Sequence, residues 1–266
     1  MNVLDRILAT KRDEVTVLRR PQTRDLLRKV ALDAAPTRDF AAALRREDHH
    51  PGLIAEIKRK SPSKGDLALD LDSGALAKEY ESGGATALSV LTDTPYFGGA
   101  IRDLEAAREA TSLPVLRKDF VIDEVQIYES RAIGADAILL ILAAVPDDSL
   151  LQELSELAQG LGLGVLVEAH DAAEVERGVA LKMPVLGVNA RNLGTFTEDL
   201  AGASALIDLI PSATITVAES AIRTADDATR MAAAGFDALL VGEALVRSDD
   251  AQGLARALVA PTVTPR

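Results

Sequence analysis

The chain contains no cysteine and no tryptophan, and only 3% of its 266 residues are aromatic. Without cysteine it can form no disulfide, no thiolate nucleophile, no iron–sulfur cluster and no cysteine-ligated zinc site. Basic residues are outnumbered, with 29 Lys and Arg against 41 Asp and Glu, so the net charge is −12. Such a charge repels nucleic acid and anionic membrane surfaces, and we expect neither as a partner. No run of about 18 apolar residues occurs, so no membrane-spanning helix is expected.

Apolar side chains are nevertheless plentiful. They make up 48% of the chain, against 26% charged residues, which is enough to bury a large core. The first residues, MNVLDRILATKRDE, become charged before any apolar stretch of signal-peptide length appears. The composition therefore predicts a folded cytoplasmic protein, and we expect a monomer or a weak oligomer.

Short apolar runs recur after residue 50, with longer helical stretches between them. This alternation is typical of a parallel sheet whose crossovers are helices. The eight runs are LIAEIK from Leu53, TALSVL from Thr86, PVLRK from Pro114, DAILLI from Asp136, GVLVE from Gly164, VLGVN from Val185, ITVAE from Ile215 and ALLVG from Ala238. Eight strands alternating with helices predict an α/β fold of the (β/α)8 type, a TIM barrel. An open doubly wound sheet is the rival, but the G-x-G-x-x-G turn expected there is absent.

Helical stretches separate these runs. The expected helices span Ser73 to Ser82, Ile101 to Thr111, Val125 to Ile133, Ser149 to Leu161, Ala172 to Leu181, Ala201 to Ile210 and Ala225 to Ala234. Gly84, Gly134 and Gly235 lie at corresponding helix-to-strand corners. Because glycine adopts the left-handed conformation readily, we expect it there at each corner.

The first 50 residues have a different pattern. Leu4, Ile7, Leu8 and Val15 recur at helical spacing among many charges, which predicts one or two amphipathic helices. We expect residues 1–50 to be an N-terminal helical extension packed on the barrel, residues 51–258 to be the catalytic barrel, and residues 259–266 to be a frayed tail.

Polar side chains stand at the ends of several apolar runs. They are Glu56, Lys58, Lys118, Glu168, Asn189, Arg191, Glu219 and Ser220. Because the carboxyl ends of barrel strands meet at one mouth, these side chains should face a single pocket. Glu56 and Lys58 share the inward side of their strand, and a buried Glu56 must meet a cation, either Lys58 or Lys118. A purely structural lattice of ion pairs is the alternative interpretation.

Two further features bear on ligands. The turns after the last two strands, at Ser220 and Ala221 and at Gly242 and Glu243, could offer backbone N–H groups to an anion, because barrels commonly bind phosphate there. His170 follows Glu168 by two residues, but no second histidine stands at a ligand spacing. We therefore expect His170 to be an ordinary loop residue and the protein to hold no metal.

Several blocks of this sequence are characteristic of one family. They are IAEIKRKSPSKG from Ile54, LTDTPYFGG from Leu91, LRKDFVIDEVQIYESRAIGADAILLI from Leu116, LVEAH from Leu166, VNARNL from Val188, AESAI and VGEAL. Together they resemble indole-3-glycerol-phosphate synthases over nearly the whole chain. The resemblance implies an enzyme of tryptophan biosynthesis that closes the ring of 1-(2-carboxyphenylamino)-1-deoxyribulose 5-phosphate, a small phosphosugar. It loses carbon dioxide and water and gives indole-3-glycerol phosphate, with no cofactor.

The resemblance also implies roles for individual residues. The family's catalytic groups fall on Glu56, Lys58, Lys118, Glu168, Asn189 and Ser220. Its substrate-binding positions fall on Ser61, Phe97, Phe120, Leu139, Arg191, Leu193, Glu219, Ala221, Gly242 and Glu243. Among these, Phe97, Phe120, Leu139 and Leu193 match apolar positions around the aromatic ring, and Arg191 with the two turns matches the phosphate contacts. Ala221 departs from the usual glycine, which weakens the phosphate site only if that position needs a positive φ.

Two other functions stay open at this point. Phosphoribosylanthranilate isomerase is a similar phosphosugar barrel, but it relies on a catalytic cysteine that this chain lacks. A non-catalytic phosphate-binding barrel would have lost its charged strand ends, whereas Lys58, Lys118 and Glu168 are all present.

Overall fold

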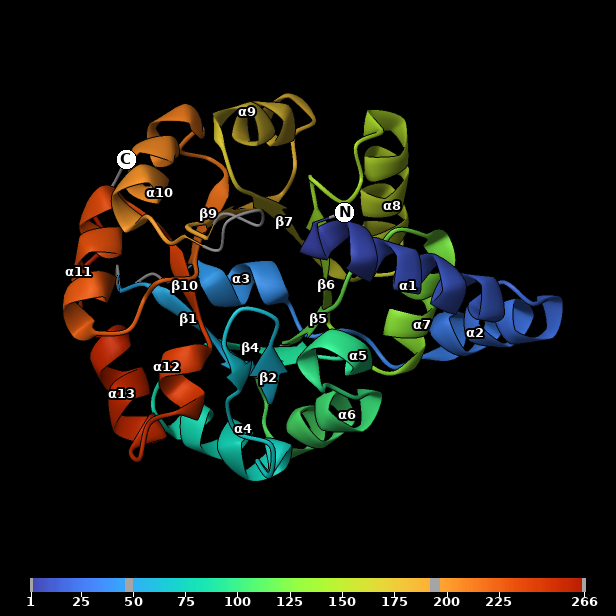
Figure 1. Ribbon diagram of the computed structural model, residues 1–266, viewed down its shortest axis with the longest axis horizontal. Coiled ribbons are helices and arrows are strands. Elements are labelled where there is room, and N and C mark those ends of the chain that lie inside the picture. Colours follow the sequence, from blue (N-terminus) through green and yellow to red (C-terminus); the bar gives the residue numbers. More distant parts are fainter. Residues whose placement is uncertain (1, 46–49, 192–196, 265–266) are drawn as a thin grey trace.

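The computed structural model describes residues 2–45, 50–191 and 197–264, and it contains a closed barrel of parallel strands (Figure 1). Its eight strands are β1 (Gly52–Ile57), β4 (Ala87–Leu91), β5 (Val115–Lys118), β6 (Ala137–Ile141), β7 (Gly164–Ala169), β8 (Val185–Asn189), β9 (Ile215–Glu219) and β10 (Ala238–Val241). Each strand pairs with the next along the chain, and β1 closes the ring between β4 and β10. The predicted (β/α)8 barrel is confirmed.

Helices connect the strands on the outside of the barrel (Figure 1). They are α4 (Ser73–Ser82), α6 (Ile101–Ala110), α7 (Glu124–Ala132), α8 (Asp148–Gly160), α9 (Ala172–Ala180), α10 (Leu200–Leu206), α11 (Ala225–Ala234) and α13 (Ala251–Leu258). Most bounds lie within a residue or so of those predicted. The helix predicted to reach Ile210 is shorter, because α10 ends at Leu206 and a 3-10 turn, Ile207–Leu209, follows. Pro211 accounts for the extended backbone of Ile210, since a residue before proline avoids the helical region.

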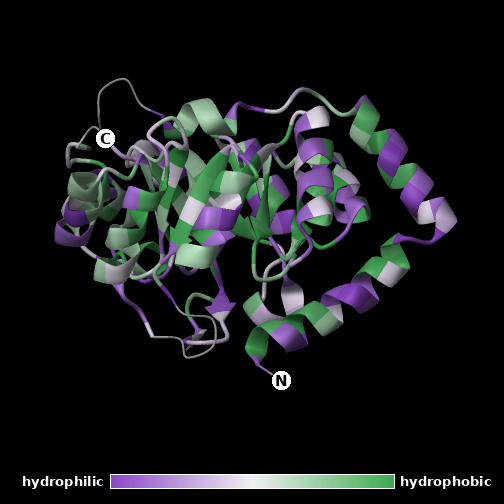
Figure 2. Cartoon of the chain, turned by 90° about the horizontal axis from the view of Figure 1, so that it is seen from above, coloured by the Kyte–Doolittle hydropathy of each residue, from purple (hydrophilic) through white to green (hydrophobic). Residues whose placement is uncertain are grey.

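Three helices precede the barrel, where the sequence predicted one or two. They are α1 (Val3–Leu18), α2 (Pro21–Asp33) and α3 (Phe40–Leu44). Asn2 and Asp5 form a capping box that starts α1, and Pro21 occupies the first turn of α2. In Figure 2, α1 and α2 form an arm that stands off one side of the barrel. No helix of the described residues is long and apolar enough to cross a membrane.

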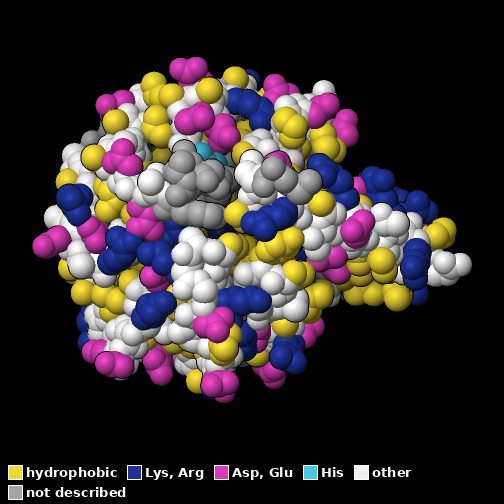
Figure 3. All heavy atoms as spheres, in the orientation of Figure 1, with side chains coloured by type: hydrophobic (Ala, Val, Ile, Leu, Met, Phe, Trp, Pro, Cys, Tyr) yellow, Lys and Arg dark blue, Asp and Glu magenta, His cyan; other side chains and the backbone are white. Residues whose placement is uncertain are grey.

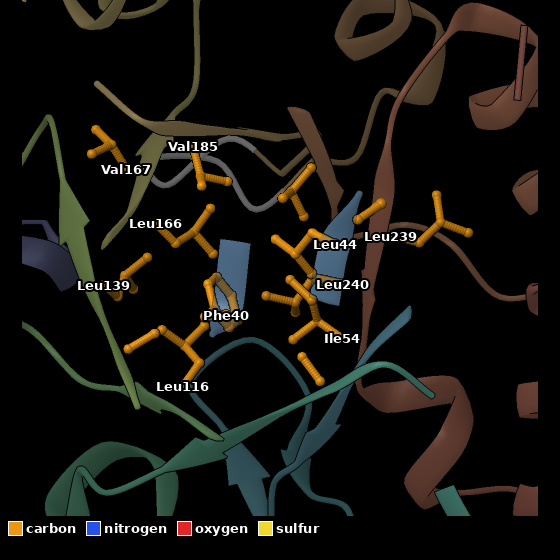
Figure 4. Close-up of a cluster of buried hydrophobic side chains, with 14 of the residues drawn as sticks. Phe40, Leu44, Ile54, Leu116, Leu139, Leu166, Val167, Val185, Leu239 and Leu240 are labelled. Atoms are coloured by element: carbon orange, nitrogen blue, oxygen red, sulfur yellow. The ribbon is translucent and has the colours of Figure 1, made fainter. Parts of the chain in front are cut away.

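The short helix α3 fills the amino end of the barrel. Phe40 is 1% exposed and Leu44 is fully buried, and both belong to the main apolar cluster. Figure 4 shows Phe40 among Leu116, Leu139 and Leu166 from three different strands. The barrel interior is thus a packed core at this end, and an open pocket can form only at the opposite, carboxyl end.

Some short elements had no periodic signal in the sequence. They are the hairpin β2 (Lys60–Ser61) and β3 (Gly65–Asp66), and the single-turn helices α5 (Thr94–Phe97) and α12 (Glu243–Val246). Local capping builds α5, because the Asp93 carboxylate accepts from the N–H groups of Tyr96 and Phe97, and Gly98 ends it with φ 64°. The three corner glycines behave as predicted, with φ 95° at Gly84, 84° at Gly134 and 97° at Gly235.

We expect Phe40→Ala to lower the free energy of unfolding by about 3–5 kcal/mol, because it leaves a cavity at the closed end of the barrel. Urea denaturation monitored by circular dichroism measures the change. Leu32→Ala on α2 is the control, since Leu32 is 64% exposed. Equal, small losses in the two variants would contradict the role of α3 as a plug.

Candidate active site

One pocket lies at the carboxyl ends of the strands, and every predicted site residue within the described ranges lines it. Those residues are Glu56, Lys58, Ser61, Phe97, Lys118, Phe120, Leu139, Glu168, Asn189, Arg191, Glu219, Ser220, Ala221, Gly242 and Glu243. Leu193 lies outside the described residues. Barrel closure therefore brings together side chains that the sequence spreads over nearly two hundred positions.

Lys118, at the end of β5, is the central charge of the pocket. Its Nζ lies 2.8 Å from Glu168 Oε2 on β7 and 2.9 Å from Glu219 Oε2 on β9. Burial disfavours a charged ammonium, but the two carboxylates outweigh it and raise the pKa of Lys118 above its ordinary value. Lys118 is therefore a cation across the physiological range.

The pKa values of the two carboxyl groups beside Lys118 are shifted in opposite directions. Burial opposes ionisation of Glu168, but Lys118 and His170 outweigh it and hold its pKa well below the ordinary value. Burial raises the pKa of Glu219 to about 8 against the pull of Lys118, and the Glu168 carboxylate adds to that rise. Glu168 therefore ionises more readily than Glu219 and is the group available as a base at neutral pH.

Glu56 pairs with Lys58, as one of the two sequence alternatives proposed. Lys58 Nζ donates to Glu56 Oε1, and Ser89 Oγ lies 3.4 Å from Glu56 Oε2. Glu56 lies near the carboxyl end of β1 and Lys58 directly follows this strand, and both line the pocket. The Lys58 ammonium is therefore held at the wall by a carboxylate partner.

Two glycines make room for the buried carboxylates. A Cβ on Gly242 would lie 2.4 Å from Glu56 Oε1, and one on Gly187 would lie 2.0 Å from Glu219 Oε1. Gly242 has φ −125°, so its backbone conformation does not itself require glycine. The sequence suggested that Gly242 lets the chain approach an anion, and the structure shows that it accommodates Glu56.

The expectation that His170 is an ordinary loop residue is wrong. Its side chain is only 9% exposed, with Nε2 3.0 Å from Glu168 Oε1 and Nδ1 3.0 Å from Glu174 Oε2. Burial alone would lower its pKa, but the two glutamates raise the pKa of His170 to about 10. Asn189 Nδ2 donates to Glu168 Oε1 as well, at 3.1 Å. His170 and Asn189 therefore orient Glu168 from two sides. The two-residue spacing between Glu168 and His170, which puts both on one side of an extended chain, could have suggested this role of His170.

The turn after β9 has an unusual backbone. Ser220 and Ala221 both have positive φ, 66° and 60°. Ala221, where the family that this sequence resembles usually has glycine, therefore does adopt the left-handed conformation. This conformation costs about 1–2 kcal/mol for alanine. Arg191, predicted to contact phosphate, lies nearby in the pocket wall but is engaged by Glu198, with its guanidinium nitrogens 2.6 and 3.2 Å from Glu198 Oε1. Ser63 Oγ accepts a third bond from Arg191, at 3.1 Å.

The opposite part of the pocket is apolar. The Phe97 and Phe120 rings lie 6.1 Å apart, centroid to centroid, in a tilted pair. Leu139 and three residues of the N-terminal segment, Val3, Leu4 and Ile7, line the same pocket. Sequence reasoning missed this contribution of α1 because a helical pattern shows which residues are buried but not against what.

Glu198 and Arg223 are also pocket residues that the sequence did not suggest. Arg223 donates to Glu198 Oε2, so this carboxylate sits between two guanidiniums. Burial opposes its ionisation, but Arg191 and Arg223 lower the pKa of Glu198.

The molecular surface in Figure 3 carries both signs of charge, with several Lys and Arg side chains near its centre. No cluster of three or more metal-ligating side chains occurs among the residues that the structure describes.

Comparison with protein families identifies the family of this chain. The model of the indole-3-glycerol phosphate synthase family matches residues 4–258. The chain belongs to the indole-3-glycerol-phosphate synthase family. It is 47% identical over 251 residues to the indole-3-glycerol phosphate synthase of Burkholderia vietnamiensis, covering 94% of this chain and 95% of that protein. It is 48% identical over 260 residues to the one of Albidiferax ferrireducens, covering 96% and 97%.

Membership of the indole-3-glycerol-phosphate synthase family makes the chain an enzyme, a carboxy-lyase, and decides against the isomerase and non-catalytic alternatives. Solved structures share only the fold. A 3-hexulose-6-phosphate synthase has a TM-score of 0.64 at 18% identity, covering 79% of this chain and 98% of that one. A thiamine phosphate pyrophosphorylase from Pyrococcus furiosus has a TM-score of 0.60 at 16% identity, covering 83% and 96%.

We expect Ala221→Gly to raise the free energy of unfolding by about 0.5 kcal/mol, because relief of left-handed strain exceeds the extra entropy of glycine in the unfolded chain. Urea denaturation measures the change. Ala75→Gly, at an exposed position within α4, is the matched control and should instead lower it by about 1 kcal/mol. A similar loss in both variants would show that the Ala221 backbone carries no strain.

Proposed function

We propose that this pocket closes the indole ring of 1-(2-carboxyphenylamino)-1-deoxyribulose 5-phosphate, with loss of carbon dioxide and water. The observation that carries the assignment of roles is the contact of Lys118 with Glu168 in a pocket with an apolar, aromatic half. A cation and a fixed carboxylate supply an acid and a base. The apolar half suits an aromatic ring.

In the first step, the ring carbon that bears the carboxylate attacks the ketone of the sugar chain. We assign Lys118 as the general acid that protonates the developing alkoxide. A pKa above the ordinary value does not prevent this, because an alkoxide is a much stronger base than the carboxylates that hold Lys118 in the free enzyme. Release of carbon dioxide then restores the aromatic ring.

Lys58 is assigned to the substrate carboxylate. Its ammonium can form charge-assisted hydrogen bonds with that group and so place the attacking carbon against the ketone. Such positioning contributes up to about 7–11 kcal/mol in intramolecular reactions. Glu56 holds Lys58 at the pocket wall until the substrate arrives.

In the second step the remaining hydroxyl leaves and the adjacent ring CH2, the former C1 methylene of the sugar chain, loses a proton, so that the indole keeps its N–H. Glu168 is assigned as the base, because its pKa is held well below the ordinary value and it is therefore ionised at neutral pH. Asn189 and His170 orient it. These roles require only groups of this chain.

The phosphate is placed near Ser220, Ala221 and Gly242, where Gly242 packs against the Glu56 carboxylate that holds Lys58. Arg191 supports this placement as a cation in the wall, although phosphate must compete there with Glu198. We also propose that the enzyme is cytoplasmic and works as a monomer or weak oligomer. Size-exclusion chromatography with light scattering tests the oligomeric state.

The overall activity is tested by adding the carboxyphenylamino substrate to the purified protein. Indole fluorescence should appear together with one equivalent of carbon dioxide. Absence of both at enzyme concentrations comparable to the substrate would refute the proposed reaction.

Lys118→Met should lower kcat by at least about 10²-fold while KM changes far less, because the variant lacks the acid but keeps the shape of the pocket. Steady-state kinetics measure both constants, and thermal unfolding confirms that the variant is folded. Lys78→Met on the outer helix α4 is the control. Turnover within a few-fold of wild type would remove Lys118 from the mechanism.

Glu168→Gln should lower turnover sharply, since glutamine keeps the shape but cannot accept a proton. The pH dependence of the wild type is a second test. A carboxyl whose pKa is depressed keeps its basic form as the pH falls and loses it only near the folded pKa, so Glu168 should cause no acid limb above about pH 5. Measured kcat/KM from neutral pH downward checks this, and a limb near pH 6 that disappears in Glu168→Gln would contradict it.

At the phosphate end we expect three substitutions to differ in their effects. Ser220→Ala should raise KM about twofold because backbone N–H groups survive it, and Arg191→Ala should raise KM more. Gly242→Val should do the most harm and lower kcat as well, because its side chain would displace Glu56. Inhibition by inorganic phosphate should weaken in the same order as KM rises. A crystal soaked in sulfate with the anion only beside Lys58 would overturn this orientation.

A further inference from the structure

Lys11 is a buried lysine on the apolar face of α1. It is 2% exposed and lies one helical turn from Ile7 and Val15, which are buried as well. A buried ammonium is costly unless it is paired. Its Nζ lies 2.8 Å from Glu14, 2.9 Å from Asp93 and 2.9 Å from Asp119, measured to carboxylate oxygens. Burial lowers its tendency to ionise, but Asp119 and Asp93 outweigh this and raise the pKa of Lys11 above its ordinary value.

The two aspartates belong to the loops that form the apolar half of the active site. Asp119 directly follows Lys118, and its Oδ1, which faces Lys11, also accepts from the Phe120 N–H at 2.8 Å. Its Oδ2 accepts from Thr92 Oγ1 at 2.5 Å. This carboxylate therefore fixes the chain between Lys118 and Phe120 at the end of β5.

Asp93 does the same for the neighbouring loop. Its Oδ1 accepts from Tyr96 N at 2.8 Å and from Phe97 N at 3.2 Å, which starts α5 and places Phe97. Its Oδ2 faces Lys11. One ammonium from α1 thus joins the two carboxylates that hold Phe97 and Phe120, whose rings are 6.1 Å apart.

A second contact ties α1 to the same loop. Tyr96 Oη lies 2.9 Å from Thr10 Oγ1 and donates to the Arg6 carbonyl at 3.1 Å. This pair is partly exposed, so the fully buried link between α1 and the loops is Lys11. A buried ion pair adds little net stability compared with apolar packing, but it fixes the geometry of the groups that it joins.

We propose that Lys11 is a positioning residue for the reaction, which sets the spacing of Phe97 and Phe120 around the aromatic ring of the substrate. The inference rests on the proposed function for the identity of that ring. With Lys11 as its buried contact, the N-terminal helix α1 holds the aromatic half of the pocket, while other elements hold the phosphate end.

The first test is Lys11→Met, which keeps the length and apolar stem of the side chain but removes the charge. We expect kcat/KM to fall about 10- to 100-fold, mainly through KM, because small displacements of binding groups have effects of this size. Inhibition by inorganic phosphate should stay within about twofold of wild type, because the phosphate end does not depend on Lys11. Arg12→Met, an exposed neighbour on α1, is the matched control and should behave as wild type.

The second variant separates positioning from stability. Lys11→Met leaves Asp93 without a cation among the described residues, whereas Asp119 keeps Arg117 at 3.3 Å, so the single variant should be less stable or fail to fold. Adding Asp93→Asn removes the stranded charge and keeps a side chain that caps α5 well. We expect the double variant to regain much of the thermal midpoint while its KM stays raised.

The proposal is overturned if the folded single variant has KM and kcat within twofold of wild type. It is also overturned if KM and the thermal midpoint recover together in the double variant, because Lys11 then only stabilises the fold. Neither result depends on whether the overall assignment is right. Failure of the proposed function would instead appear in the wild type, as the absence of an indole product.

Discussion

The ammonium of Lys118, held between two buried glutamates, is the interaction on which the site depends. A cation at that depth is tolerated only because Glu168 and Glu219 lie 2.8 and 2.9 Å away. Conversely, Lys118 and His170 keep Glu168 ionised in a place where burial alone would protonate it. The acid and the base of the proposed mechanism thus hold each other in the required charge states before the substrate binds, and the substrate must then replace part of these contacts.

The barrel makes this arrangement possible through strand register and the absence of side chains at two positions. Glu168 pairs in register with Gly187, and Glu219 pairs with Asn189 two residues further along β8, so both carboxyl groups lie near the carboxyl end of that strand. Glycine at 187 and 242 leaves the volume that the carboxyl groups of Glu219 and Glu56 occupy. The packed plug around Phe40 closes the other end, so the charged layer has a rigid apolar core beneath it.

The pocket is divided into halves that are held differently. Around the turn after β9, the chain accepts a strained backbone at Ser220 and Ala221, and Arg191 shares Glu198 with Arg223. The aromatic half is held from outside the barrel, because the loops after β4 and β5 are joined to α1 through Lys11. The N-terminal helices are therefore part of the active-site structure as well as a cover for the barrel.

Local patterns in the sequence were sufficient to determine the eight strands, the helices between them, the corner glycines and the charged groups at the strand ends. These features depend on residues close together in the chain, where periodicity and glycine preference act directly. Only the tertiary structure decided that Lys118 meets partners 50 and 101 residues away, that Lys11 serves two loops of the barrel, and that His170 orients Glu168. Such contacts follow from barrel closure and side-chain packing, which bring distant segments together, and no local pattern specifies which buried charge will meet which partner.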